Sequence, residues 1–149
     1  MKINLNIDES ILEDVVEFKI KKLTSKIQKT IEYLNTEEPN VLIGYKKEEI
    51  VLIKPDEIVV IFTEGKKVYV KLLSGEKFAI KERLYEIEES YKNSGFIRIA
   101  NSSIANGKLI RKLKMESDGS LSVVFKDGTS EFASRRSVKN IKTYLGIGV

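Results

Sequence analysis

From Val41 onward the sequence is a succession of short apolar runs separated by turn residues, and this rhythm restricts the fold more than any other feature. Runs of about four to eight residues rich in β-branched and aromatic side chains, bounded by glycine, aspartate or serine, are typical of β-strands. An Asp-Gly step between two such runs indicates a tight hairpin, and it occurs in "ESDG" and again in "KDGT". The runs are "VLIGY", "EIVLI", "EIVVIFTE", "KVYVKLL", "FIRIA", "KLIRKLKM", "SLSVVF" and "SEFAS", with the turn "SGEK" (74–77) after the fourth. We therefore predict a mainly β domain of packed antiparallel sheets over 41–149.

Short helices and an N-terminal extension complete the predicted architecture, which is α+β overall. Apolar residues spaced three and four apart predict helices over 82–93 and over 137–146, the latter ended by Gly146. Before the β domain, "KINLNI" (2–7) alternates and "VVEFKI" (15–20) is β-branched, so both are predicted as strands. Residues 22–35 have the period of an amphipathic helix, and "NTEEPN" (35–40) is typical of a linker. Residues 1–38 are thus expected to form a small αβ extension.

The chain contains no histidine, cysteine or tryptophan. Their absence excludes disulfides, thiol nucleophiles and histidine-based acid–base catalysis. No phosphate-cradling glycine loop and no metal-ligand spacing occurs either. We therefore expect a protein that is not an enzyme and needs no cofactor. No long apolar run and no secretory signal pattern is present, so we expect a cytoplasmic protein without membrane insertion.

The basic charge is concentrated in the last third of the chain. Residues 96–149 carry ten lysines and arginines against four acidic residues, a net charge of +6, whereas residues 1–95 carry −2. A polyanion-binding surface leaves such an asymmetry in a sequence. A lysine-rich soluble surface is an equally good explanation from charge alone.

Three polar segments follow predicted strands without an obvious structural duty. They are "TEGKK" (63–67), "NSSIAN" (101–106) and "SRRSVK" (134–139). Serine, asparagine, lysine and arginine are the residues that bind phosphates and base edges. Arg135 and Arg136 stand at a predicted helix start, where the helix dipole favours acids, so a structural role explains them poorly.

Other residues near these segments have structural interpretations. Arg98 alternates with two isoleucines and is expected to form a salt bridge with a nearby carboxylate. Asn106 precedes a glycine, which suggests a turn. Tyr85 and Phe62 are expected in the core.

The β domain resembles the LytTR DNA-binding domain of bacterial transcription regulators, over about 41–147. "EIVVIFTEGKKVYV" is similar to the family's early strand and loop, and "KERLYEIEE" to its helix before the central motif. "GFIRIANSSIAN" resembles the family signature, with Phe96, Arg98, Ser102 and Asn106 on its pattern. The most specific likeness is "FKDGTSEFASRRSVKNIKTYLG", in which the turn, strand, arginine-bearing loop and helix occur in the family's order.

This resemblance implies an elongated β fold that places loops in the major grooves of bent DNA. Arg136 is the preferred base reader, because a guanidinium can bond guanine O6 and N7 together. Ala100 stands where the family often has histidine, so the preferred DNA sequence is expected to differ, and Glu64 in the first loop repels phosphate unless it accepts from a cytosine amino group. The implied base or phosphate contacts are Lys66, Lys67, Asn101, Ser102, Ser103, Ser134, Arg135, Arg136, Ser137 and Lys139.

The sequence therefore predicts a stand-alone, sequence-specific transcription regulator that binds repeated half-sites on double-stranded DNA as a homodimer. The N-terminal extension is the candidate dimerisation element, and a regulatory protein partner could supply the input signal. The alternative is a protein-interaction module without DNA specificity, in which the arginines are merely solvated. Salt dependence separates the two, because binding through several phosphates weakens steeply with salt.

Overall fold

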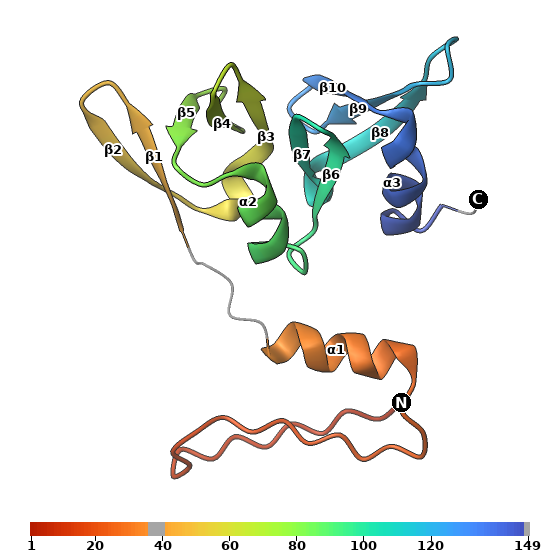
Figure 1. Ribbon diagram of the computed structural model, residues 1–149. Helices are drawn as coiled ribbons and strands as arrows, with labels where there is room; N and C mark the ends of the chain where they lie inside the picture. Colours follow the sequence, from red (N-terminus) through yellow and green to blue (C-terminus); the bar gives the residue numbers. More distant parts are fainter. Residues whose placement is uncertain (36–40, 148–149) are drawn as a thin grey trace. The chain divides into compact units, whose positions relative to one another are not determined.

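The computed structural model describes residues 1–35 and 41–147 (Figure 1). The chain divides into two compact units, Met1–Asn35 and Thr36–Val149. The linker predicted over 35–40 lies outside the described residues, apart from Asn35.

The N-terminal unit contains one helix, α1 (Ser25–Asn35), within its described residues. Thr24 caps this helix by accepting a hydrogen bond from the Ile27 amide on its Oγ1 (3.2 Å). The helix prediction is confirmed, but the strand predictions over 2–7 and 15–20 are wrong, since neither segment forms a strand. Ile3, Leu5 and Ile7 alternate as a strand would, yet all three are exposed. Alternation produces a strand only where a neighbouring strand takes up the backbone hydrogen bonds.

The second unit is built on two antiparallel sheets (Figure 1). The larger sheet has the strand order β2-β1-β5-β4-β3-β7-β6, and the smaller one the order β10-β9-β8. The strands of the larger sheet are β1 (Leu42–Lys46), β2 (Glu49–Ile53), β3 (Ile58–Glu64), β4 (Lys67–Leu72), β5 (Lys77–Ile80), β6 (Phe96–Ala100) and β7 (Ser103–Asn106). The smaller sheet contains β8 (Ile110–Met115), β9 (Leu121–Phe125) and β10 (Ser130–Ala133). The helices are α2 (Leu84–Ser90) and α3 (Val138–Tyr144), with 3₁₀ turns at Pro55–Glu57, Gly107–Leu109 and Arg135–Ser137.

Strand β3 lies between two hydrophobic clusters, which explains its uninterrupted apolar sequence. Ile58 and Ile61 belong to a cluster that includes Leu84 and Ile87 of α2. Val59 and Val60 belong to a second cluster, which contains the buried residues of β9 and Ile141 of α3. A strand covered on both faces needs apolar residues at every position rather than at alternate ones.

The strands and helices predicted for this unit are confirmed within a few residues, but β5 lies in none of the predicted runs, and its first residue, Lys77, falls in the predicted turn 74–77. The segment "NSSIAN" was predicted as a loop, but Ser103–Asn106 form β7 between β3 and β6. The two central residues of this strand, Ile104 and Ala105, are buried, but the polar residues at both ends obscure the strand pattern in the sequence.

Candidate nucleic-acid interface

The first predicted loop is the turn of the β3–β4 hairpin. Gly65 and Lys66 occupy the two turn positions between the paired Glu64 and Lys67. Gly65 has φ +63°, which glycine adopts without strain at the first position of a two-residue hairpin turn. Lys66 and Lys67 are both exposed at this tip. Glu64 forms an ion pair with Lys77 (Oε2–Nζ 2.6 Å), so its charge is compensated within the protein.

The second predicted loop is the turn Asn101–Ser102 between β6 and β7, and Arg98 holds its backbone in place. The guanidinium donates from Nε to the Ala100 carbonyl (2.8 Å) and from Nη2 to the Asn101 carbonyl (2.6 Å). It also forms an ion pair with Glu88 of α2 (Nη1–Oε2 2.6 Å), which confirms the predicted salt bridge. Asn101 and Ser102 themselves are exposed. Arg98 therefore shapes a loop whose polar side chains face solvent.

Ser103 is buried, with 5% of its surface exposed, and it pairs with Phe62 in the sheet. Ser103 lines one of the hollows between the loops but exposes little surface for a contact, so we leave it out of the proposed interface. Asn106 is also buried, where its Nδ2 donates to the Ile58 carbonyl (2.9 Å) and its Oδ1 accepts from the Lys108 amide (3.1 Å). This is the structural role expected of Asn106.

The third predicted loop follows β10 and leads through the 3₁₀ turn Arg135–Ser137 into α3. The Ser134 and Ser137 side chains are half-buried, and their hydroxyls form a hydrogen bond across the turn (2.9 Å). Arg135 donates from Nη2 to the Asp118 carbonyl in the β8–β9 turn. The side chain of Arg136 is exposed and forms no hydrogen bond or ion pair with any residue in 1–35 or 41–147. Lys139 is exposed in the first turn of α3.

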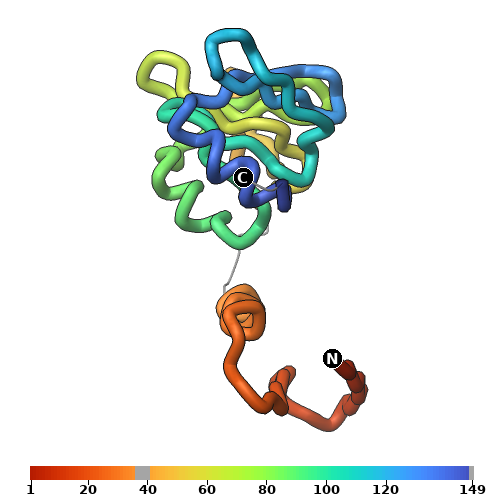
Figure 2. The backbone as a smooth tube through the Cα atoms, turned by 90° about the vertical axis from the view of Figure 1, so that its right-hand side faces the viewer, coloured from red at the N-terminus to blue at the C-terminus, as the bar shows by residue number. Residues whose placement is uncertain are grey.

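Backbone hydrogen bonds bring the three loops together at one end of the domain. The Thr63 amide donates to the Ser102 carbonyl (2.9 Å), which joins the end of β3 to the second loop. The Ser134 amide donates to the Ile99 carbonyl (2.8 Å), which joins the end of β10 to β6. The β3–β4 and β8–β9 turns project at this same end, at the top of the domain in Figure 2. Segments about 35 residues apart in the sequence thus share one surface.

Two shallow hollows run between the loops and reveal residues that the sequence did not indicate. One is lined by Thr63, Ala100, Ser102, Glu131, Phe132 and Ser134, among others. The other includes Lys66, Tyr85, Arg98 and Asn101. Tyr85, predicted in the core, is 71% exposed, and Phe62 is only half-buried. Phe132 is exposed in β10, where the alternation of "SEFA" placed it opposite the buried Ala133 and could have indicated it.

The carboxylates near the loops differ in their electrostatic surroundings. Burial raises the pKa of Glu131, and the positive charge of Lys71 offsets part of this effect. Hydrogen bonds from Ser120 lower the pKa of Asp118, and the nearby Arg135 contributes to the same direction. Within the described residues no group of three or more acidic, histidine or cysteine side chains is arranged to hold a metal ion. None of the helices in that part of the chain is long and apolar enough to cross a membrane.

Comparisons with known proteins show what this chain is similar to. The family model of the LytTR DNA-binding domain matches residues 48–146. The chain is 33% identical over 148 residues to uncharacterized HTH-type transcriptional regulators of Staphylococcus aureus strains NCTC 8325 and MRSA252, and the match covers 99% of this chain and 99% of each relative. A solved LytTR DNA-binding domain from Bacillus cereus superposes with a TM-score of 0.68 at 18% identity, covering 73% of this chain and 99% of that one.

The regulators match almost the whole chain, whereas the solved domain matches 73% of it. The predicted resemblance and the mainly antiparallel β fold with short helices are confirmed. Transcription regulators of this kind act by binding DNA and carry out no chemical reaction. The chain belongs to the LytTR family of DNA-binding transcriptional regulators.

Proposed function

We propose that the three-loop surface reads repeated half-sites on double-stranded DNA in the cytoplasm, and that the protein does so as a homodimer. The observation that carries this proposal is the pair of backbone bonds, Thr63 to Ser102 and Ser134 to Ile99, that hold the three loops at one end of the domain. Exposed lysine and serine side chains there suit phosphates, which position a protein on the duplex. The residues proposed to contact DNA are Lys66, Lys67, Asn101, Ser102, Ser134, Arg135, Arg136, Ser137 and Lys139.

The loops rather than a helix are the proposed reading elements. The staphylococcal relatives are named as HTH-type regulators. Among the described residues, however, no two helices follow one another directly, because strands separate α1 from α2 and α2 from α3. A helix-turn-helix needs two consecutive helices joined by a short turn. We therefore assign sequence reading to the turns at the ends of β3, β6 and β10.

The two arginines are proposed to have different roles. Arg135 is tied to the Asp118 carbonyl and so fixes the third loop against the β8–β9 turn. Arg136 has no partner within the described part of the protein, so its guanidinium is available for the edge of a guanine. Residues 1–38 are proposed as the main dimerisation element, because Ile3, Leu5 and Ile7 are exposed apolar residues in that extension.

The experiment that tests this function is the selection of bound sequences from a random duplex pool at physiological salt. Wild type is compared with Arg136→Ala, and with Lys126→Ala as a control that removes one positive charge from the turn at the opposite end of β10. We expect Arg136→Ala to weaken binding by about 1–3 kcal/mol and to relax specificity at one base pair. Lys126→Ala should leave the selected motif unchanged.

The salt dependence of the same variants provides a second test. Each phosphate contact adds about 0.9 to the slope of the logarithm of affinity against the logarithm of salt concentration. Lys66→Ala should therefore reduce the slope by about 1 without changing the motif, while Lys126→Ala should not. A pool without any enriched sequence for wild type would contradict the proposal and favour a protein-interaction module.

A further inference from the structure

Among the described residues, strand β2 is an edge of the seven-stranded sheet with no further strand beside it. It has β1 as its single neighbour in the sheet. The other edge strand, β6, is partly closed, because the Ser134 amide donates to the Ile99 carbonyl there. An uncovered edge presents unpaired N–H and C=O groups and is a ready template for another strand.

The register of the β1–β2 hairpin determines which backbone groups point outward. Lys46 pairs with Glu49 across the two-residue turn, so this is a hydrogen-bonded pair. The antiparallel ladder alternates, and the groups of Val51 and Ile53 therefore also point toward β1. The N–H and C=O groups of Ile50 and Leu52 point the other way, toward the open edge.

The side chains on the outer face of β2 are apolar in the middle and charged at both ends. Ile50 and Leu52 are 71% and 68% exposed, whereas Ile53 on the opposite face is fully buried. Glu48 lies in the turn directly before β2 and Lys54 directly after the strand, and both are exposed.

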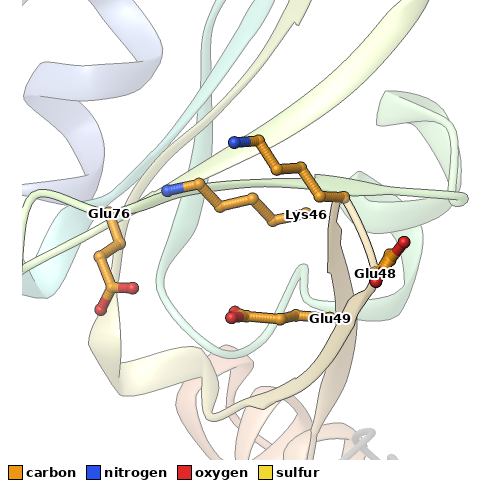
Figure 3. A pocket seen from close by; sticks show the side chains of 5 residues that line it. Lys46, Glu48, Glu49 and Glu76 are labelled. Atoms are coloured by element: carbon orange, nitrogen blue, oxygen red, sulfur yellow. The ribbon is translucent and has the colours of Figure 1, made fainter.

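Figure 3 shows the charged residues around the β1–β2 turn. Glu49 and Lys46 extend toward Glu76, while Glu48 points away from them. Along this edge the turn residue Glu48, the outer-face residues Ile50 and Leu52, and Lys54 after the strand thus form a row that reads acidic, apolar, apolar, basic.

We propose that β2 pairs with β2 of a second copy of this chain, antiparallel and around a two-fold axis at Val51. In this register Ile50 lies opposite Leu52 of the second copy, and Glu48 lies opposite Lys54. The outward backbone groups of Ile50 and Leu52 then bond one another across the axis, as the alternating ladder requires. Opposite charges face each other at both ends, which stabilises a cross-strand pair.

Neighbouring registers lose these matches. A shift that moves the axis to Ile50 places Glu48 opposite Leu52 and removes the charge pairing. An axis between two residues places outer-face residues of one copy opposite core-facing residues of the other. Because opposite residues project to the same face of a sheet, core-facing apolar side chains would then lie on the exposed face. The row is therefore self-complementary about Val51, and this self-complementarity is what selects a second copy as the occupant.

The proposed contact rests on the proposed homodimer for its role, and adds a place where the DNA-binding units themselves meet. A five-residue edge buries far less than the about 1,200–2,000 Å² of a stable complex, so this contact alone is expected to be weak. Strand spacing of about 4.8 Å and a rise of about 3.4 Å per residue put the two Leu42 residues about 20 Å apart. Leu42 begins β1, so both N-terminal extensions would join the dimer near its axis.

Thiol capture in the full-length protein detects a weak contact of this kind. The chain has no native cysteine, so Val51→Cys introduces the only thiol in each copy. Directly opposite residues of a non-hydrogen-bonded pair have Cα atoms about 4.5 Å apart, within the range of a disulfide. The matched control is Leu52→Cys, whose thiol is more exposed but whose two copies lie about 8 Å apart in this register, too far to be bridged.

We expect rapid disulfide dimers for Val51→Cys under mild oxidation and few for Leu52→Cys. Equal cross-linking of both variants, or faster cross-linking of Leu52→Cys, would reveal random collision and overturn the proposal. Absence of cross-linking in both would also overturn it, provided that free-thiol titration shows that both thiols are reactive.

Charge exchange tests the register independently. Glu48→Lys and Lys54→Glu each place like charges across the axis, so each variant alone should cross-link through Val51→Cys about tenfold less than the parent. A mixture of the two restores opposite charges at both ends and should form mixed dimers preferentially. A statistical mixture of dimers would overturn the register.

The binding of a single half-site separates this inference from the proposed function. If Val51→Cys binds one half-site as wild type does, its failure to cross-link counts against the edge contact alone. If wild type binds no DNA while Val51→Cys still cross-links, the DNA proposal fails and the edge contact stands.

Discussion

At the scale of single residues, the guanidinium of Arg98 organises the second loop through its hydrogen bonds to two backbone carbonyls. Arg98→Ala removes two charged hydrogen bonds to the Ala100 and Asn101 carbonyls, each worth about 1.5–3 kcal/mol at most. We expect this variant to lose stability in urea titrations and to bind DNA several-fold more weakly. Glu88→Gln is the control, because it removes a partly exposed ion pair worth about 0–1 kcal/mol and keeps both carbonyl bonds. Normal DNA affinity for a folded Arg98→Ala protein would contradict the positioning role.

Glu131 links the same surface to pH. Its pKa is raised by burial, so the folded protein binds a proton at this site more readily than the unfolded chain does. Stability from this group is therefore greatest at acid pH and falls as the pH rises through the raised pKa. We expect Glu131→Gln to be more stable than wild type at pH 7, and the difference to vanish below the ordinary pKa of 4.5.

Urea titrations at several pH values measure this difference. Glu9→Gln, at an exposed position of the N-terminal unit, is the control and should show no such trend. A constant difference between Glu131→Gln and wild type at all pH values would show that packing rather than charge is responsible.

At the scale of elements, Gly44 allows the β1–β2 hairpin to lie against β5. A side chain at this position would bring its Cβ within 2.9 Å of the Phe78 Cβ and within 2.5 Å of the Ile53 Cδ1. We expect Gly44→Ala to cost about 1–3 kcal/mol of the free energy of unfolding, as overpacking of a core does. Ile43→Thr, next to it on the outer face, should change stability by less than about 0.5 kcal/mol. Equal effects in urea titrations would mean that the space around Gly44 can relax.

The elements also show how far the sequence could lead. Strands with regular apolar spacing and Asp-Gly turns were predictable, because local preference and tertiary packing agree there. Strand β7 was not, since Ser103 and Asn106 are polar and become buried only through partners distant in the sequence, such as Phe62 and the Ile58 carbonyl. The N-terminal run "KINLNI" failed in the opposite way: it has the alternation of a strand but no neighbouring strand to pair with.

The candidate site shows the same limit. Exposed basic residues such as Arg136 and Lys66 could be named as candidate DNA contacts from the sequence, because a structural role explains a positive charge poorly at these positions. That the three loops meet depends on bonds such as Thr63 to Ser102, which no local pattern encodes. Tyr85 was wrongly predicted in the core. Which face of its helix is buried depends on the packing of Leu84 and Ile87, and Tyr85 lies on the exposed face.

At the scale of the whole molecule, the charge asymmetry and the two units indicate that DNA recognition and self-association belong to different parts of the chain. The basic excess lies in residues 96–149, which supply the second and third loops, while the N-terminal unit carries exposed apolar residues. The family model matches residues 48–146, so the DNA-binding domain that it describes does not include residues 1–35. Recognition and self-association can then be separated by truncation.

We expect the fragment 36–149 to fold and to bind a single half-site with the affinity of the full chain. On DNA with two half-sites it should lose about 10²-fold in affinity, because linking two binding modules raises their joint affinity by about 10²–10⁴ without new DNA contacts. Mobility-shift titrations with one-site and two-site duplexes measure both quantities. The weak β2 contact would leave the fragment some residual cooperativity, and Glu48→Lys in the fragment should remove that remainder. If the fragment binds two sites as cooperatively as the full chain does, residues 1–35 are not the dimerisation element, and the DNA-binding unit alone must bring the two copies together.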